Sequence, residues 1–406
     1  MMLAESSFWP SLTLKATLAN IRPEAGLLLC CARTCLPAEA IARIRTLLQE
    51  DIDWPYLLRT ARSHGMMPLL YWHLNATCPE RIPKATLDQL REHFHDNAQR
   101  NLFLTGELVT LLKLLEARDI LAVPYKGPVL SAAAYGNLAL RQFRDLDILV
   151  RKRDALTAKD LLIAQGYRPS VHITQAQEPA YLRSQYEYEF LRADGKVVVE
   201  LHWGVTPRSF SFSPDFDRLW ERLQPVSLAG TTVWTFAPED VLLMLCVHGS
   251  KHCWARLEWI CSIALLVGAY EKIDWEQLMV EAGTLGSQRM LMLGLVLASD
   301  LLGAVLPAEV LRMAQADRTV EALKELVQQR LFLERKPSGL FESALFHLKA
   351  RERPRDRIRY CLRLAMTTTA RDWTTAQIPP LLSFLYYPLR AIRLTKKYGP
   401  SLLRRE

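Results

Sequence analysis

The chain has 406 residues, of which 50% are hydrophobic and 23% are charged, and its formal net charge is +8 at pH 7. This composition excludes a disordered or fibrous protein. The length exceeds what one ordinary core accommodates, so we expect two or three domains. The positive charge favours an anionic partner, whether a nucleotide, a nucleic acid or a membrane surface, without choosing among them.

The cysteines indicate the cellular compartment of the protein, and the apolar runs indicate whether the chain can span a membrane. The eight cysteines form no CxxC pair and most lie in apolar, helix-like surroundings, which predicts reduced core residues in a cytoplasmic protein. The first residues lack a basic start followed by an apolar block, so we expect no signal peptide. The apolar run 26–31 is too short to span a bilayer, and the run 242–254 is interrupted by His248, Lys251 and His252, so we expect no membrane span.

Residues 1–118 are predicted to form a helical region. Segment 37–50 begins with a proline near a helix start and carries apolar residues at helical spacing. Segment 83–118 has a leucine-rich stripe and no internal proline. It predicts one long amphipathic helix, with Gly106 as the point at which that helix could break.

Residues 119–236 are the only part with a mixed α/β pattern. Short apolar runs, turn signals and two helical segments, 129–137 and 155–167, alternate there, and they predict a small mixed sheet. The predicted strands and helices fall in segments 119–127, 129–137, 145–150, 155–167, 186–203 and 226–236. The segment 186–203 has a hairpin signal, in which two alternating strands are joined by Ala193, Asp194 and Gly195.

Residues 237–406 are predicted to be helical again, which gives a three-part protein with boundaries at 1–118, 119–236 and 237–406. The acidic start at Glu239 and Asp240 favours a helix through the helix dipole. The end of the chain mixes apolar and basic residues. We expect a last helix docked on the body of the protein, and the alternative is a segment that lies on an anionic membrane surface.

Two carboxylates lie one residue apart in the apolar run 145–150. In a strand, this spacing places Asp145 and Asp147 on one face, and Leu146, Ile148 and Val150 then point the other way into a core. Carboxylates side by side repel each other unless a cation holds them. Their hard oxygen atoms suit Mg²⁺ or Mn²⁺ better than zinc. A solvated strand end is the alternative interpretation.

A third acid follows the hairpin valines. Glu200 ends an apolar strand, where a carboxylate is costly unless it is paired or bound to a metal. Beside Asp145 and Asp147 in the sheet, it would complete a site for two metals about 3.5–4 Å apart. His202 shares the face of Glu200 and could orient it or meet the substrate, and a structural histidine is the alternative.

Several basic residues are candidates for binding phosphate. Lys126 and Gly127 lie between a predicted strand and helix, where a helix N-terminus favours phosphate. Arg141 and Arg144 flank the acidic strand and either neutralise phosphate or pair with a neighbouring acid. Further along the chain, Lys251, His252 and Arg256 could form a basic helix face toward a triphosphate or an acceptor, and His248 and His252 have the i,i+4 spacing of a possible metal pair. A solvated helix face is the alternative there, and the absence of an HExxH pattern argues against zinc.

These motifs, in this order, resemble the nucleotidyltransferase superfamily with a polymerase-β-like fold, and more closely a bacterial group of uncharacterised nucleotidyltransferases. The resemblance covers about residues 98–300. It rests on "YKGPVLSAAAYGN", "RQFRDLDILV", "VELHW", "HGSKHCWARLEWICSIALLV" and "IDW". Pro128 stands where the superfamily has a serine, and Ser262 stands where the group has an aspartate.

The resemblance implies an α+β protein with a small mixed-sheet nucleotidyltransferase domain between helical regions. It implies transfer of a nucleoside monophosphate from an NTP such as ATP to an acceptor hydroxyl, with release of pyrophosphate. Asp145, Asp147 and Glu200 would be the catalytic, metal-binding carboxylates, and Lys126 and Gly127 would replace the superfamily's Gly-Ser turn.

The acceptor and the oligomeric state are not predicted by the sequence. A protein side chain, a small metabolite and an RNA end all remain open as acceptors. A second hypothesis is a catalytically degenerate scaffold of the same fold, which the residues at positions 128 and 262 favour.

Overall fold

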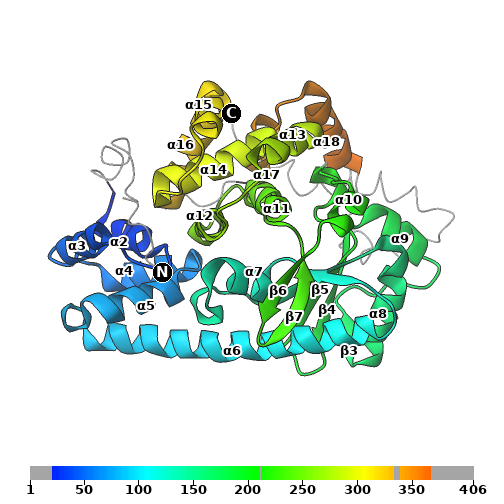
Figure 1. The fold of residues 1–406 in the computed structure, drawn as a ribbon, viewed down its shortest axis with the longest axis horizontal. Helices are drawn as coiled ribbons and strands as arrows, with labels where there is room; N and C mark the ends of the chain where they lie inside the picture. Colours follow the sequence, from blue (N-terminus) through cyan, green and yellow to red (C-terminus); the bar gives the residue numbers. More distant parts are fainter. Residues whose placement is uncertain (1–20, 211, 333–338, 367–406) are drawn as a thin grey trace, which may run out of the picture. The chain divides into compact units, whose positions relative to one another are not determined.

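The structure of the chain is a computed structural model that describes residues 21–210, 212–332 and 339–366 (Figure 1). Helices dominate it, and they accompany one five-stranded mixed sheet and one two-stranded hairpin. The structure therefore confirms the predicted α+β class with a small mixed sheet.

The described residues belong to two compact units. Unit 1 lies within residues 1–109, 125–143 and 217–352, and unit 2 lies within residues 110–124, 144–216 and 353–406. Each unit is therefore assembled from three separate segments of the chain. The division into domains at 1–118, 119–236 and 237–406 stays a prediction.

Unit 2 is built on the five-stranded sheet. Its strands are β1 (Ala122–Pro124), β2 (Asp145–Val150), β3 (Tyr167–Pro169), β4 (Glu187–Arg192) and β5 (Val198–His202), in the order β1-β2-β5-β4-β3. Strands β2 and β5 are parallel, and the other neighbouring pairs are antiparallel. The turn between β4 and β5 contains Gly195 at φ 73°, a left-handed conformation that glycine adopts without strain. The predicted hairpin is confirmed.

The two faces of the central strands differ in chemistry. Alternation along each strand puts one set of side chains into the core. The core set is fully or almost fully buried and consists of Leu146, Ile148, Val150, Tyr188, Phe190, Val199 and Leu201. The opposite set is mostly polar and consists of Asp145, Asp147, Glu187, Glu189, Glu200 and His202. We call this second set the acidic face.

Short helices complete unit 2. They are α8 (Ala155–Ala164), α9 (Glu178–Ser184) and α18 (Pro354–Met366), together with the 3₁₀ turns η4 (Lys152–Asp154) and η5 (Arg208–Phe210). Helix α8 is followed by Gly166 at φ 84°, in the left-handed conformation expected just after a helix end.

The N-terminal part of unit 1 is helical, as predicted. Its helices are α2 (Pro23–Cys31), α3 (Ala38–Leu47), α4 (Trp54–Ser63) and α5 (Met67–Thr77), followed by η1 (Pro79–Arg81). Helix α6 (Lys84–Glu116) then runs for 33 residues and passes Gly106 without a break, and its residues from 110 onward belong to unit 2. The single long helix expected from the leucine stripe is therefore confirmed.

The remaining elements of unit 1 come from two later segments. The first segment forms α7 (Gly127–Leu130), a π-helical turn (Ser131–Tyr135) and η3 (Leu138–Leu140). The second begins with α10 (Phe216–Glu221), which starts at the boundary between the units, and the hairpin of β6 (Gln224–Leu228) and β7 (Thr231–Thr235). It continues with α11 (Pro238–Lys251), α12 (Leu257–Ala269), α13 (Trp275–Leu285), α14 (Gln288–Leu302), α15 (Ala308–Ala316), α16 (Arg318–Phe332) and α17 (Leu340–Lys349).

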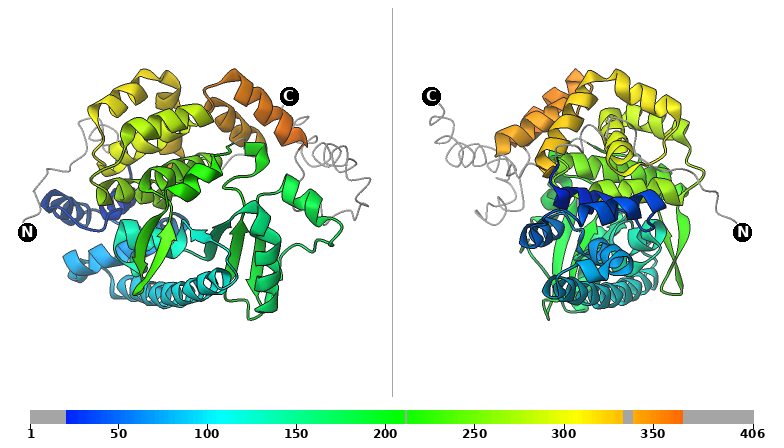
Figure 2. Two further views of the ribbon diagram at one scale, coloured as in Figure 1. Left: turned by 45° about the vertical axis from the view of Figure 1, so that its right-hand side comes forward. Right: turned by 90° about the vertical axis from the view of Figure 1, so that its left-hand side faces the viewer.

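Helices α11, α12 and α14 pack against one another and form neighbouring yellow-green helices in Figure 2. Trp254 is fully buried. Two glycines let the helix backbones approach its ring, because a Cβ atom on Gly249 would lie 2.5 Å from the indole and one on Gly294 would lie 2.9 Å from it. This close packing makes α11, α12 and α14 the centre of the core of unit 1.

None of the helices in the described part of the chain combines the length and the apolar character that a bilayer span requires. The predicted docking of the basic, apolar C-terminal segment concerns residues 378–406, which lie outside the described residues.

Candidate functional site

Asp147 and Glu200 lie side by side on the acidic face. Strands β2 and β5 run parallel, and their register pairs Asp147 directly with Glu200. Asp147 is 5% exposed, whereas Glu200 is half-buried. The sequence reasoning placed Glu200 beside the acidic strand, and the structure brings it next to Asp147 in particular.

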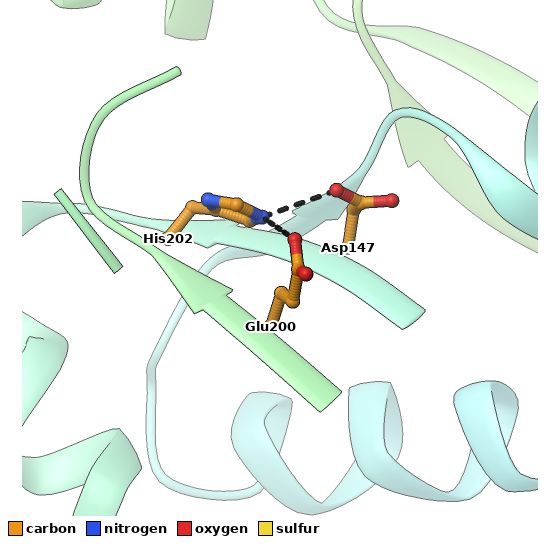
Figure 3. A group of neighbouring side chains, drawn as sticks. All are labelled: Asp147, Glu200 and His202. Carbon is orange, nitrogen blue, oxygen red and sulfur yellow. Dashed lines mark hydrogen bonds and ion pairs between the residues drawn. The ribbon is translucent and has the colours of Figure 1, made fainter. Parts of the chain in front are cut away.

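His202 lies between the two carboxylates (Figure 3). Its Nε2 atom is 3.1 Å from Oδ1 of Asp147 and 3.3 Å from Oε2 of Glu200. Its Nδ1 atom is 3.2 Å from Oε2 of Glu187 in an ion pair. The ring is 2% exposed. Both ring nitrogens therefore face carboxylates.

The charge on His202 follows from these neighbours. Burial lowers the pKa of an imidazole, but the hydrogen bonds to Asp147 and Glu200 and the charges of Glu187 and Asp147 outweigh it and raise the pKa of His202 to about 9. At neutral pH the ring carries a positive charge. It offsets part of the repulsion among the surrounding acids.

A row of carboxylates crosses three neighbouring strands. Glu200 is the register partner of Asp147 on one side and of Glu189 on the other. Like charges directly opposite each other destabilise a sheet, so this row favours a cation on the acidic face. The sequence reasoning missed Glu187 and Glu189. Their signal was the alternation in "YEYEF" (186–190), which places both glutamates on one face of a hairpin strand.

Three side chains of the described residues are placed to share one metal ion. Asp147, Glu200 and His202 each offer a ligand atom, and these atoms all lie within 4.8 Å of one another. Two carboxylate oxygens suit Mg²⁺ or Mn²⁺, and an imidazole nitrogen is a better ligand for Mn²⁺ than for Mg²⁺. The donor set therefore fits a divalent cation.

Asp145 does not belong to this group of three. It lies on the same face of β2, two residues before Asp147, and is half-buried. In the register of the sheet, its partner on β5 is Val198 rather than an acid. The structure thus separates the two aspartates by their neighbours, and a metal-binding role for Asp145 stays a prediction.

Lys126 and Gly127 lie in unit 1 at the start of α7. Gly127 has φ 51° and is buried, so it turns the chain at the first residue of this helix. Lys126 is half-buried, and its ammonium group lies 4.9 Å from the ring centroid of Tyr125. A phosphate-binding role for both residues stays a prediction.

The structure brings Lys126, Lys251 and His252 together within unit 1. Burial and then the charges of Lys251 and Lys126 lower the pKa of His252 below its ordinary value. The ring centroid of His252 lies 4.6 Å from that of His248 and 5.3 Å from that of Trp259. These residues form a patch that is both cationic and aromatic, which suits an aromatic anion such as a nucleotide.

The two arginines beside the acidic strand have different surroundings. Arg141 is 7% exposed, and its Nη2 atom lies 3.6 Å from Oε1 of Glu258. Its backbone carbonyl accepts hydrogen bonds from the side chains of Asn97 and Asn101 at 3.2 and 2.7 Å. Arg141 thus belongs to a buried ion pair in unit 1. Arg144 is exposed, and phosphate binding by either arginine stays a prediction.

One of three comparisons with known proteins identifies a family for the chain. A search of curated protein sequences found no significant match. One solved structure with a similar arrangement is an antigenic nucleotidyltransferase-like protein from Paracoccidioides brasiliensis, at 13% sequence identity, with 52% of this chain and 96% of that chain covered and a TM-score of 0.30. A likeness at this TM-score supports no inference about function. The family model of uncharacterised nucleotidyltransferases matches residues 50–303, more than half of the chain, and the chain therefore belongs to that family.

Proposed function

We propose that the protein transfers a nucleoside monophosphate from an NTP to an acceptor hydroxyl and releases pyrophosphate. The observation that carries this proposal is the pairing of Asp147 with Glu200 on adjacent parallel strands of a nucleotidyltransferase-family chain. Nucleotidyl transfer needs clustered carboxylates, because the reacting phosphate is an anion that a carboxylate pair can approach only through a cation.

Asp147 and Glu200 would hold Mg²⁺ or Mn²⁺, with Asp145 as the further carboxylate that the family resemblance implies. Bound divalent metal lowers the pKa of the acceptor hydroxyl and stabilises the charge that develops on pyrophosphate. The acceptor oxygen forms a bond to the α-phosphorus, and the bond from this phosphorus to the oxygen bridging to the β-phosphate breaks. Glu200, which is half-buried, would accept the hydroxyl proton and pass it to water.

His202 has a positioning role in this proposal. Its ring bridges Asp147 and Glu200 through Nε2 while Glu187 faces Nδ1. A ring held from both sides keeps the two carboxylates at a fixed separation. Pre-organised carboxylates lose less conformational freedom when a cation binds.

We further propose that the patch of Lys126, Lys251 and His252, which lies within unit 1, binds phosphate. Positive charge on Lys126 and Lys251 would offset the charge of a bound phosphate. The rings of His248 and Trp259 offer flat surfaces to a base. Phosphate binding at this patch does not require the metal site.

A second function is favoured by one observation. His202 already supplies a positive charge to Asp147 and Glu200, so the acidic face is stabilised without a metal. A catalytically degenerate scaffold would use the helices of unit 1 or unit 2 as partner surfaces. It would need no metal ion to stabilise the acidic face.

The deciding experiment measures thermal stability with each NTP, with and without Mg²⁺ or Mn²⁺. It compares the wild type with the double variant Asp145→Asn/Asp147→Asn. A ligand that binds the native state raises the melting temperature by mass action. A metal-dependent shift in the wild type alone supports the transferase and identifies the nucleotide. Equal shifts in both proteins, or none in either, support the scaffold.

A further inference from the structure

A second cluster of charge in unit 2 is basic and lies outside the proposed metal site. It consists of Lys152, Arg183, Arg208, Arg359 and Arg363, and we call it the basic cluster. Its members come from four elements that are distant in sequence, namely η4, α9, η5 and α18. The basic cluster is therefore formed by the tertiary structure and is not the charged face of a single helix.

Contacts between the arginines themselves hold the cluster together. Arg363 donates from Nη1 to the backbone carbonyl of Arg208 at 3.1 Å. Arg208 in turn donates from Nη1 to the carbonyl of Arg183. Arg359 also forms an ion pair with Asp356 at 3.8 Å. The guanidiniums of Arg208 and Arg363 therefore each donate to a backbone carbonyl, which orients them.

The backbone around the cluster is also ordered by hydrogen bonds. The indole N–H of Trp203 donates to the carbonyls of Leu182 and Gln185, at 3.2 and 3.1 Å, on either side of Arg183. The hydroxyl of Thr206 donates to the carbonyl of Phe212 at 3.1 Å and closes the loop that carries Arg208. These hydrogen bonds order the backbone that carries Arg183 and Arg208.

The like charges are close enough to act on one another. Burial and then the charges of Arg208 and Arg183 lower the pKa of Lys152 below its ordinary value. Burial and then the charges of Arg359 and Arg208 lower the pKa of Arg363. Cations held together in this way repel, and an anion with several charges would relieve the repulsion.

The position of the cluster relates it to the acidic face. Lys152 follows the carboxyl end of β2, Arg208 follows the carboxyl end of β5, and Arg183 precedes the start of β4. In the register of the sheet, these three strand ends lie at one edge, where Leu149 pairs with His202 and His202 pairs with Glu187. A strand of nucleic acid along this edge would pass the end of the acidic face.

We propose that the basic cluster binds the phosphate backbone of a nucleic-acid strand that serves as the acceptor. This proposal rests on the proposed transferase function, because it names the class of its acceptor. Four of the five cations are arginines, whose planar guanidinium group matches the oxygens of a phosphate in a bidentate way. Several cations spread over four elements suit a repeating anion better than a single small metabolite.

The test is a binding measurement with the full chain in EDTA and without nucleotide. The probes are a fluorescein-labelled, 12-nucleotide single-stranded RNA and the DNA of the same sequence, followed by fluorescence anisotropy over a range of salt concentrations. We expect Lys152→Gln/Arg208→Gln to weaken binding at least tenfold. The slope of log K against log[salt] should fall by about 1.4, since each phosphate contact on a single strand contributes about 0.7.

The control variant Lys272→Gln/Arg312→Gln removes the same charge from exposed positions of unit 1 and should bind like the wild type. A second variant, Lys152→Gln/Arg359→Gln, leaves the Arg208 hydrogen bond in place and should also weaken binding. Absence of binding by the wild type, or an equal loss in the control variant, would overturn the proposal. A further assay measures binding to vesicles that contain phosphatidylglycerol. If Lys152→Gln/Arg208→Gln lost binding to these vesicles but bound both strands like the wild type, the proposal would also be overturned. The RNA and DNA arms distinguish the two possible strands.

Failure of this proposal and failure of the transferase proposal are distinguishable. The binding assay contains neither metal nor NTP, so Asp147→Asn should bind the strands like the wild type. Suppose that the protein binds nucleic acid through the basic cluster but shows no metal-dependent shift of the melting temperature with any NTP. Nucleic-acid binding would then be supported, and the transferase function would not.

Discussion

Asp147 on β2 and Glu200 on β5 are register partners, and Nε2 of His202 lies within 3.3 Å of an oxygen of each. Strand pairing therefore brings Asp147 on β2 into contact with Glu200 and His202 on β5. An acid pair with a bridging imidazolium is stable as it stands, and it becomes a ligand set for a divalent cation only when the ring gives up its proton. Variants of these residues separate the two roles.

Asp147→Asn should abolish metal-dependent nucleotide binding. The amide keeps the size of the side chain but removes the charge that attracts a divalent cation, so the transfer rate should fall by at least ~100-fold. Isothermal titration with Mn²⁺ and a pyrophosphate-release assay measure both effects. Asp88→Asn, the same change at a partly exposed residue of α6 that pairs with Arg91, should behave like the wild type. Unchanged Mn²⁺ affinity in Asp147→Asn would remove this residue from the metal site.

His202→Gln should weaken Mn²⁺ binding about tenfold, since the glutamine lacks the rigid ring that positions the carboxylates of Asp147 and Glu200. The variant should also have a lower melting temperature in EDTA, because Asp147, Glu200 and Glu187 lose the charge that they share. Manganese titration and thermal unfolding test the two statements separately. Tighter Mn²⁺ binding by the variant would instead show that His202 competes with the metal.

Lys126→Gln should weaken nucleotide binding about tenfold, which corresponds to the loss of about 1.4 kcal/mol. The reason is the proximity of Lys126 to His252 and Lys251 in the patch assigned to phosphates. Binding of a fluorescent NTP analogue measures the change, with exposed Lys272→Gln as the matched control. An affinity equal to that of the control would move the nucleotide away from this patch.

Gly249→Ala should destabilise unit 1 by about 1–3 kcal/mol, because overpacking a well-packed core displaces its side chains. The new Cβ would lie 2.5 Å from the ring of Trp254, which is fully buried and has no open space into which to move. Gly268→Ala is the matched control: its Cβ would meet nothing within 4 Å, so it should be neutral or stabilising by up to ~1 kcal/mol. Chemical denaturation of both variants measures the difference. Equal stabilities would contradict the described packing of α11.

His64 should make unit 1 sensitive to acid. Its Nδ1 atom accepts a hydrogen bond from the backbone N–H of Leu257 at 3.2 Å. Burial lowers the pKa of His64 to about 4, against a hydrogen bond to the Leu331 backbone that raises it, and the charge of Arg256 lowers it further. The native state thus favours the neutral ring, whereas the unfolded state binds the proton with the ordinary pKa of 6.5.

The stability that depends on neutral His64 is therefore complete above pH 6.5 and is lost as the pH falls toward 4, by roughly 3 kcal/mol in total. In His64→Asn, the amide oxygen can still accept from Leu257 but does not titrate. Unfolding free energies at pH 7 and pH 4 should differ more in the wild type than in this variant. Exposed His95→Asn should keep the wild-type dependence, and identical profiles for all three proteins would contradict the buried, neutral state of His64.

The sequence by itself determined the local features of the site. Alternation with a period of two set the faces of β2 and β5, because successive side chains of a strand point to opposite sides. It placed Asp145 and Asp147 on one face and Glu200 and His202 on one face before any strand pairing was known. Continuous apolar spacing likewise determined α6, and Ala193, Asp194 and Gly195 determined the hairpin turn.

Only the tertiary structure decided which of these residues meet. Alternation gives a face but no register, and register depends on how the apolar side of each strand packs into the core. The observed register pairs Asp147 with Glu200 and Asp145 with Val198. It also brings Glu187 to His202. Packing of α12 likewise buried Arg141 beside Glu258, because long-range burial, which no short segment encodes, determines the partner of a charged side chain.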